Sequence, residues 1–144
     1  MWGDRADGVL VSRPESAAEA RREVEFALYP LLCSPDVSLR PAHHARAMDA
    51  SLVASELVGH VHHHTGSSRE CLLVCLLHSS EITIVVTDPC DADLPRFPPP
   101  LDHGRAGVES AFWSVVNRVA HQVDVQALPT GGRIISAAVA LTGP

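Results

Sequence analysis

The feature that most constrains the fold is a proline-rich stretch over residues 88–105. Five of the eleven prolines of this 144-residue chain fall there, in the sequence DPCDADLPRFPPPLDHGR. Because proline has a fixed φ and no backbone N–H, this stretch can form neither a helix nor a central strand. A loop of this length is unusual in a compact domain and is typical of a functional lid or a mobile segment. The regular elements are therefore expected on either side of it.

Three segments carry apolar residues at the three- and four-residue steps of an amphipathic helix. They are residues 16–32, 42–64 and 108–120. At the start of the first segment, Ser16 and Glu19 have the spacing of a capping box, in which each side chain accepts a hydrogen bond from the exposed backbone N–H of the other residue. These patterns predict three helices, two before the proline-rich stretch and one after it.

Four short runs of β-branched or apolar residues predict strands. They are residues 71–77, 81–87, 123–128 and 133–141. The order helix, helix, strand, strand, loop, helix, strand, strand predicts an α+β two-layer sandwich, with the helices on one face of a mixed, mostly antiparallel sheet. We expect a single domain over residues 1–144, with an irregular N-terminus over residues 1–14.

Charge and composition argue against several classes of protein. Seventeen acidic against eleven basic residues give a formal net charge of -6, and no basic run is denser than Arg21-Arg22, so no nucleic-acid partner is expected. No apolar stretch reaches the roughly 18 residues of a membrane span, and no signal peptide is recognisable, which predicts a cytoplasmic protein without membrane contact. The four cysteines have no disulfide-framework spacing, so reduced, mostly buried thiols are expected.

Four segments carry residues suited to nucleotide chemistry. They are SELV at residues 55–58, VVTDP at 85–89, HGRAG at 103–107 and PTGGR at 129–133. In this order and spacing they resemble the N box, adenine-binding box, glycine-containing lid and final turn of the anti-sigma-factor serine kinases of actinobacteria, a branch of the histidine-kinase-like (GHKL) ATPases. The similarity spans residues 18–141. It implies a Bergerat-type ATPase fold, with ATP and Mg²⁺ as cofactors.

The resemblance implies a role for several individual residues. Glu56 would be the catalytic base, polarising a water or a substrate hydroxyl towards a γ-phosphate. Asp88 would accept a hydrogen bond from the exocyclic amine of adenine, and Gly104, Arg105 and Gly107 would bind phosphates at a helix N-terminus. Ordinary structural roles stay open beside these: a solvated helix glutamate, a turn-initiating aspartate and a helix-entry loop. If Asp88 binds adenine, Asp88→Asn should weaken stabilisation by ATP and leave the melting temperature of the free protein nearly unchanged.

The largest departure from the family pattern is His60. It stands four residues after Glu56, where the family has an asparagine whose amide oxygen helps to hold Mg²⁺. Imidazole is a poor ligand for this hard cation, which prefers oxygen. The lid glycines also stand three residues apart, whereas the family usually has them two apart. His60 therefore occupies a predicted nucleotide-binding position without the usual magnesium ligand. Either Mg²⁺ is held in a different way than in the family, or catalysis is lost.

His60 also belongs to a histidine cluster at the end of the second predicted helix. His60 and His64 are four residues apart, the spacing of paired ligands for a borderline ion such as Zn²⁺, and no third ligand stands at a telling spacing. The alternative is that residues 62–64 form the polar end of the helix, where the dipole favours imidazolium. The sequence therefore assigns no metal ligand.

Three functions are consistent with these patterns. The first, implied by the resemblance, is an ATP-binding regulator that sequesters a sigma factor and phosphorylates a serine of a STAS-type anti-anti-sigma protein, with homodimerisation left open. The second is a pseudo-ATPase that keeps the fold and the partner-binding surface without transferring phosphate. The third and weakest is a metal-dependent sensor built on the histidine cluster.

Overall fold

Nine helices and strands make up the part of the chain that the computed structural model describes, which is residues 8–33, 36, 38, 40–65, 71–89, 108–129 and 131–141. In chain order they are β1 (Gly8–Ser12), α1 (Ala17–Ala27), α2 (Tyr29–Leu32), α3 (Arg40–Thr65), β2 (Leu73–Leu77), β3 (Glu81–Asp88), α4 (Val108–Val119), β4 (Gln122–Ala127) and β5 (Arg133–Ala140). The second and third predicted helices and the four predicted strands are confirmed, with their ends displaced by two residues or fewer. The proline-rich stretch beyond Pro89 lies outside the described residues.

The five strands form one sheet in the order β1-β2-β3-β5-β4, and every neighbouring pair is antiparallel. The α+β prediction is confirmed, but the expectation of a mixed sheet is wrong. The strands β3 and β4, which a helix connects, do run in the same direction, as a crossover connection requires. Because β5 lies between them, they are not neighbours, and no parallel pair forms within the described sheet.

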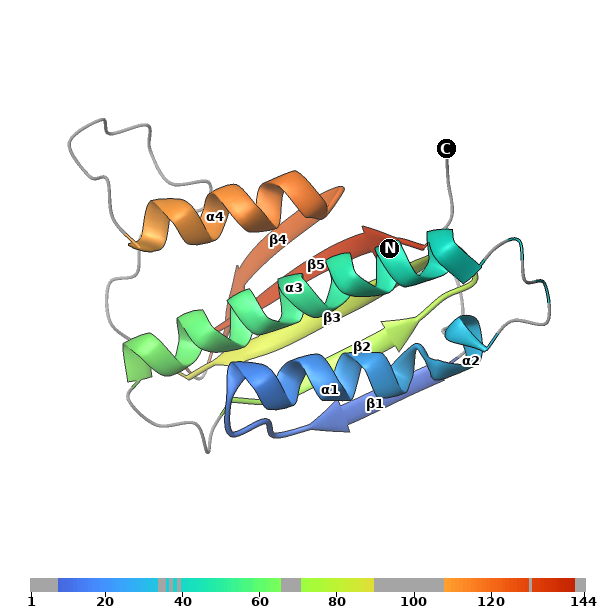
Figure 1. Ribbon diagram of the computed structural model, residues 1–144. Coiled ribbons are helices and arrows are strands. Elements are labelled where there is room, and N and C mark those ends of the chain that lie inside the picture. Colours follow the sequence, from blue (N-terminus) through green and yellow to red (C-terminus); the bar gives the residue numbers. More distant parts are fainter. Residues whose placement is uncertain are drawn as a thin grey trace.

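The three longer helices α1, α3 and α4 lie side by side on one face of the sheet (Figure 1). The central helix is α3, which contacts α1, α4, β3 and β5. Strand alternation sends Ile82, Ile84 and Val86 of β3 into the layer beneath α3, where they are fully buried. The hydrophobic core therefore lies between the helix layer and this face of the sheet, and it includes residues of α1 and β2 as well as of α3, β3 and β5. Within the described residues, no helix is long and apolar enough to cross a membrane.

The N-terminal region differs from the prediction at two places. Residues Gly8–Ser12 form strand β1, which pairs with β2 at the edge of the sheet, so the expectation of an irregular N-terminus is wrong for these residues. Residues 1–7 lie outside the described residues. The run GVLVS does contain the β-branched residues typical of a strand, and pairing with β2 places it in the sheet.

The first predicted helix is also shorter than expected, although its start is confirmed. Ser16 Oγ accepts a hydrogen bond from Glu19 N at 3.1 Å, as predicted. Glu19 Oε2 accepts from Glu15 N at 3.2 Å, one residue before the predicted donor Ser16 N. The helix α1 then ends at Ala27, and the single turn α2 follows. Pro30 has no N–H to donate to the preceding turn, which explains why one continuous helix does not extend to residue 32.

Two buried thiols lead to a prediction about alkaline pH. Burial raises the pKa of Cys71 to about 11 and of Cys75 to about 12, with nearby carboxylates adding to both shifts. Above pH 9 the thiols of the unfolded chain ionise, whereas both thiols of the folded chain stay neutral until the pH approaches their raised pKa values. The stability that the two neutral thiols confer is therefore complete below about pH 9 and is lost as the pH rises through 11–12. We expect urea unfolding at pH 10 to show a loss of about 1 kcal/mol per thiol relative to pH 8.

A Cys71→Ala/Cys75→Ala variant is the control, because other groups also titrate in this range. Its stability should depend less steeply on pH between 8 and 10 than that of the wild type. Cys33 is exposed, so it should react with iodoacetamide at pH 8 while Cys71 and Cys75 do not. Alkylation of all three thiols at similar rates in the folded protein would contradict the burial.

Candidate functional site

Two charged residues face each other at one end of the middle strands. Asp88 is the last residue of β3, Arg133 is the first residue of β5, and the two are paired across the strands in the antiparallel register. Both residues share the strand face that carries the buried Ile84 and Ile135, so their side chains point into the helix-covered layer. Two opposite charges are thus placed inside the apolar sandwich rather than at its surface.

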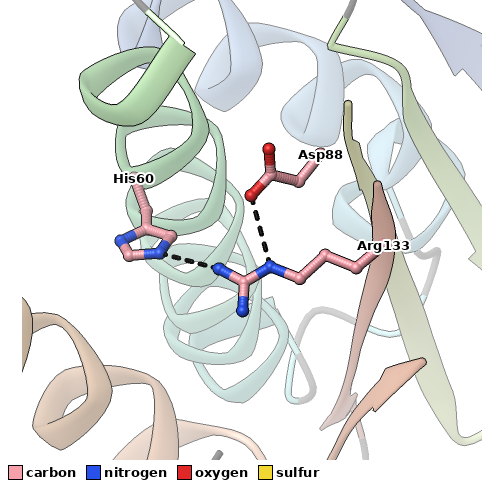
Figure 2. Close-up of polar contacts among 3 residues, drawn as sticks. All are labelled: His60, Asp88 and Arg133. Atoms are coloured by element: carbon pink, nitrogen blue, oxygen red, sulfur yellow. Dashed lines mark hydrogen bonds and ion pairs between the residues drawn. The ribbon is translucent and has the colours of Figure 1, made fainter. Parts of the chain in front are cut away.

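The two side chains form a buried ion pair. Arg133 Nε donates to Asp88 Oδ2 at 3.2 Å, and the exposed fractions of the two side chains are 9% and 0% (Figure 2). Removing two charges from water is costly, and the structure tolerates it because each charge neutralises the other at hydrogen-bond distance. The carboxylate of Asp88 is therefore already engaged by a cation of the same chain.

His60 on α3 extends this pair to the helix layer. Its Nε2 lies 3.2 Å from Arg133 Nη2, and His60 is itself buried (Figure 2). A guanidinium is always charged and can only donate, so His60 Nε2 is the acceptor, which requires a neutral imidazole with its proton on Nδ1. Arg133 thus bridges β3 and α3 through two polar contacts. We call His60, Asp88 and Arg133 the buried polar triad.

The turn before β5 brings Arg133 to its place. Gly131 and Gly132 have φ values of 100° and 80°, a region that favours glycine, and Leu128 N donates to Gly132 O at 3.0 Å to close the turn. A Cβ on Gly132 would lie 2.5 Å from Asp88 O, so the turn packs directly against the end of β3. The PTGG turn predicted from the sequence is therefore also a packing element of the triad.

The structure brings together two of the predicted site residues. His60 and Asp88 meet at the triad, and Glu56 lies half-buried on α3, one helical turn before His60. Gly104, Arg105 and Gly107, the predicted phosphate-binding residues, lie outside the described residues.

Arg133 was missed as a site residue and counted only as the end of a turn segment. The sequence did contain a signal, because Arg133 is a lone charge at the start of the apolar run RIISAAVAL. A charge in that position has to be compensated if the strand is buried. The sequence does not say which residue compensates it.

The triad does not fit ATP and Mg²⁺ as the resemblance would assign them. The carboxylate expected to accept from adenine is paired with Arg133, and the ring nitrogen at the expected magnesium position accepts from the same guanidinium. A cation beside His60 would also face the positive charge of Arg133, which opposes a second cation there.

The histidine cluster has no complete set of metal ligands in the described part of the chain. No group of three His, Cys, Asp or Glu side chains that could hold a metal ion is found there. The side chain of His64 lies outside the description, and His60 is committed to Arg133. The metal-sensor hypothesis thus receives no support from the described residues.

Comparison of the whole chain with protein families and with curated proteins does not test the resemblance of the four segments. No protein-family model matches the chain, and no similar curated protein is found.

Proposed function

We propose that this chain is a pseudo-ATPase: a regulatory domain related to the anti-sigma-factor serine kinases that acts by binding proteins and does not transfer phosphate. The observation that carries the proposal is the buried polar triad. Asp88, which the resemblance assigns to adenine, is paired with Arg133, and His60 replaces the magnesium-holding amide. The GHKL fold and the sigma-factor and STAS-type partners are part of this proposal, and they rest on the resemblance of the four segments.

The energetic balance supports this proposal. If adenine took the place of Arg133 at Asp88 Oδ2, it would break a buried ion pair, and the loss of one partner from such a pair costs about 3–5 kcal/mol. A hydrogen bond from the adenine amine to the freed carboxylate would return about 1.5–3 kcal/mol. The exchange is unfavourable unless Arg133 finds another buried anion. A protein-binding role needs no such exchange, because it uses the surface of the fold and leaves the triad intact.

The direct test is a calorimetric titration with ATP and Mg²⁺. We expect no heat of binding up to millimolar ATP, and no phosphate transfer from labelled ATP to a purified STAS-type protein. The variant His60→Asn restores the family's amide but leaves the ion pair of Asp88, so we expect it to remain inactive in both assays. Saturable ATP binding by the wild type together with phosphate transfer to the STAS-type protein would contradict the proposal and favour the kinase.

The protein-binding half of the proposal has its own measurement. Purified sigma-factor and STAS-type domains can be titrated against the chain by biolayer interferometry, with and without ATP. We expect binding whose affinity is the same in both conditions. An affinity that ATP changes tenfold or more would show that nucleotide still reaches the domain.

A further inference from the structure

The contact between His60 and Arg133 depends on the charge of the imidazole. His60 Nε2 lies 3.2 Å from Arg133 Nη2, and His60 is buried (Figure 2). A guanidinium keeps its charge and has no acceptor atom, so the hydrogen bond exists only while Nε2 carries no proton. A proton on Nε2 would place two cationic N–H groups against each other inside the fold, where their repulsion is strong. The contact therefore requires one protonation state of His60.

Carboxylates near His60 could favour its protonation, and their positions limit that effect. Asp88 Oδ2 accepts from Arg133 Nε at 3.2 Å, so its charge is balanced by the same guanidinium. Glu56, one turn earlier on α3, is half-buried, so water weakens its field. The other charged or titratable groups that the structure describes on the elements packed against α3 are half-buried or exposed, and they are Glu19, Arg21, Arg22, Glu23, Glu25, Tyr29, Glu81 and Arg118. The charge in direct contact with Nε2 is thus positive.

The same contact attaches α3 to one end of the sheet, where β3 ends and β5 begins. Beside this end, Leu72 N donates to Thr87 Oγ1 at 2.9 Å and Thr87 N donates to Leu72 O at 3.0 Å. The preceding residue, Cys71, is fully buried, and the charge of Asp88 adds to the effect of burial in raising the pKa of its thiol, as expected of neighbours. Separation of α3 from this end of the sheet should therefore make Cys71 accessible.

We propose that His60 is a pH-sensitive latch between α3 and the sheet. At neutral pH the imidazole accepts from Arg133 and holds α3 against the start of β5. At mildly acidic pH the imidazole takes up a proton from solvent, the hydrogen bond from Arg133 is lost, and α3 separates locally from this end of the sheet. The ion pair of Arg133 with Asp88 remains. The latch does not depend on the proposed function, because it involves neither a nucleotide nor a protein partner.

The direction of the pH effect follows from proton uptake. A histidine of the unfolded chain takes up a proton as the pH falls through about 6.5, whereas the closed latch holds His60 neutral. The unfolded chain then binds more protons, so the stability that the latch confers is complete above about pH 6.5 and is lost as the pH falls below it. One proton changes the equilibrium constant of unfolding by about tenfold per pH unit.

Urea unfolding of the wild type and of His60→Gln measures this effect. Glutamine offers an uncharged oxygen to Arg133 and does not titrate. Between about pH 6 and pH 5, the equilibrium constant of unfolding should rise about tenfold more in the wild type than in the variant. If His60→Gln does not fold, His60→Asn takes its place with the same expected result. An equal pH dependence of the wild type and the variant would overturn the proposal.

A second measurement separates local opening from global unfolding. Dithiodipyridine is a disulfide reagent that labels thiols at acidic pH, and tandem mass spectrometry gives the labelling rate of each cysteine. Cys71 lies beside the latch, whereas Cys75 is buried within β2 near Glu23 of α1. From about pH 7 to about pH 5.5, the rate of Cys71 relative to Cys75 should rise roughly tenfold in the wild type and stay constant in His60→Gln. A constant ratio in the wild type would overturn the latch.

The matched control is His43→Gln. His43 lies on the same helix and is buried to 7% exposure, against 8% for His60, but it stands near the start of α3, far from the latch. This variant should keep the pH dependence of the Cys71 to Cys75 ratio that the wild type shows. Loss of that dependence in His43→Gln, with retention in His60→Gln, would assign the effect to the wrong histidine and overturn the proposal.

Discussion

Replacing Asp88 with asparagine is expected to lower the free energy of unfolding by about 3–5 kcal/mol. Asparagine has the shape of aspartate without its charge, so the variant leaves the guanidinium of Arg133 buried and uncompensated. The sequence alone predicted the opposite for the free protein, namely a melting temperature that barely moves. Urea unfolding monitored by circular dichroism distinguishes the two outcomes, and a change below about 1 kcal/mol would contradict a buried pair.

A double-mutant cycle separates the ion pair from general damage to the fold. The single variant Arg133→Met should cost a similar amount, because it leaves the carboxylate of Asp88 buried without its cation. The double variant Asp88→Asn/Arg133→Met should be more stable than either single variant, since neither charge is then left alone. Additive losses in the double variant would show that the two residues act independently.

Replacing Gly132 with alanine is expected to destabilise the protein by roughly 2–4 kcal/mol. The residue has a φ of 80°, and a Cβ there would lie 2.5 Å from Asp88 O and 3.0 Å from Pro89 Cα. Both of these atoms belong to the backbone, so the strand end itself would have to move. Thermal unfolding should show a clear fall in melting temperature.

A second glycine provides the matched control for this substitution. Gly59 lies within α3, and a Cβ there would meet the Cβ of Ala17 at 4.0 Å, which is an ordinary contact. Gly59→Ala should therefore stabilise the protein by about 0.5–1 kcal/mol, because alanine is the better helix former. Equal effects of the two substitutions would show that the turn does not press against β3.

Gly132→Ala and Asp88→Asn should not be additive. The turn places Arg133 opposite Asp88, so a variant that moves the turn already weakens the ion pair. Once the pair is weakened, removing the charge of Asp88 costs less than it does in the wild type. A combined loss equal to the sum of the single losses would mean that the turn and the triad are separate features.

The candidate site was only partly predictable from the sequence. Asp88 and His60 stood out because one ends a strand-forming run and the other interrupts a family pattern, and both signals are local. Their connection was not visible. Arg133 lies 45 residues after Asp88 and 73 after His60. Its contact with Asp88 is decided by strand register and its contact with His60 by helix packing, and neither follows from spacing along the chain.

The sequence by itself determined where α3, α4 and the two hairpins form, because apolar periodicity, β-branched runs and proline act within a few residues. For the same local reason it predicts no regular structure in the proline-rich stretch, which beyond Pro89 lies outside the described residues. Only the tertiary structure decided that Gly8–Ser12 joins the sheet and that β5 lies between β3 and β4. That placement sets Arg133 opposite Asp88. It turns an expected adenine contact into a buried ion pair, because the partner of a buried charge is chosen by what the whole fold brings within hydrogen-bond distance.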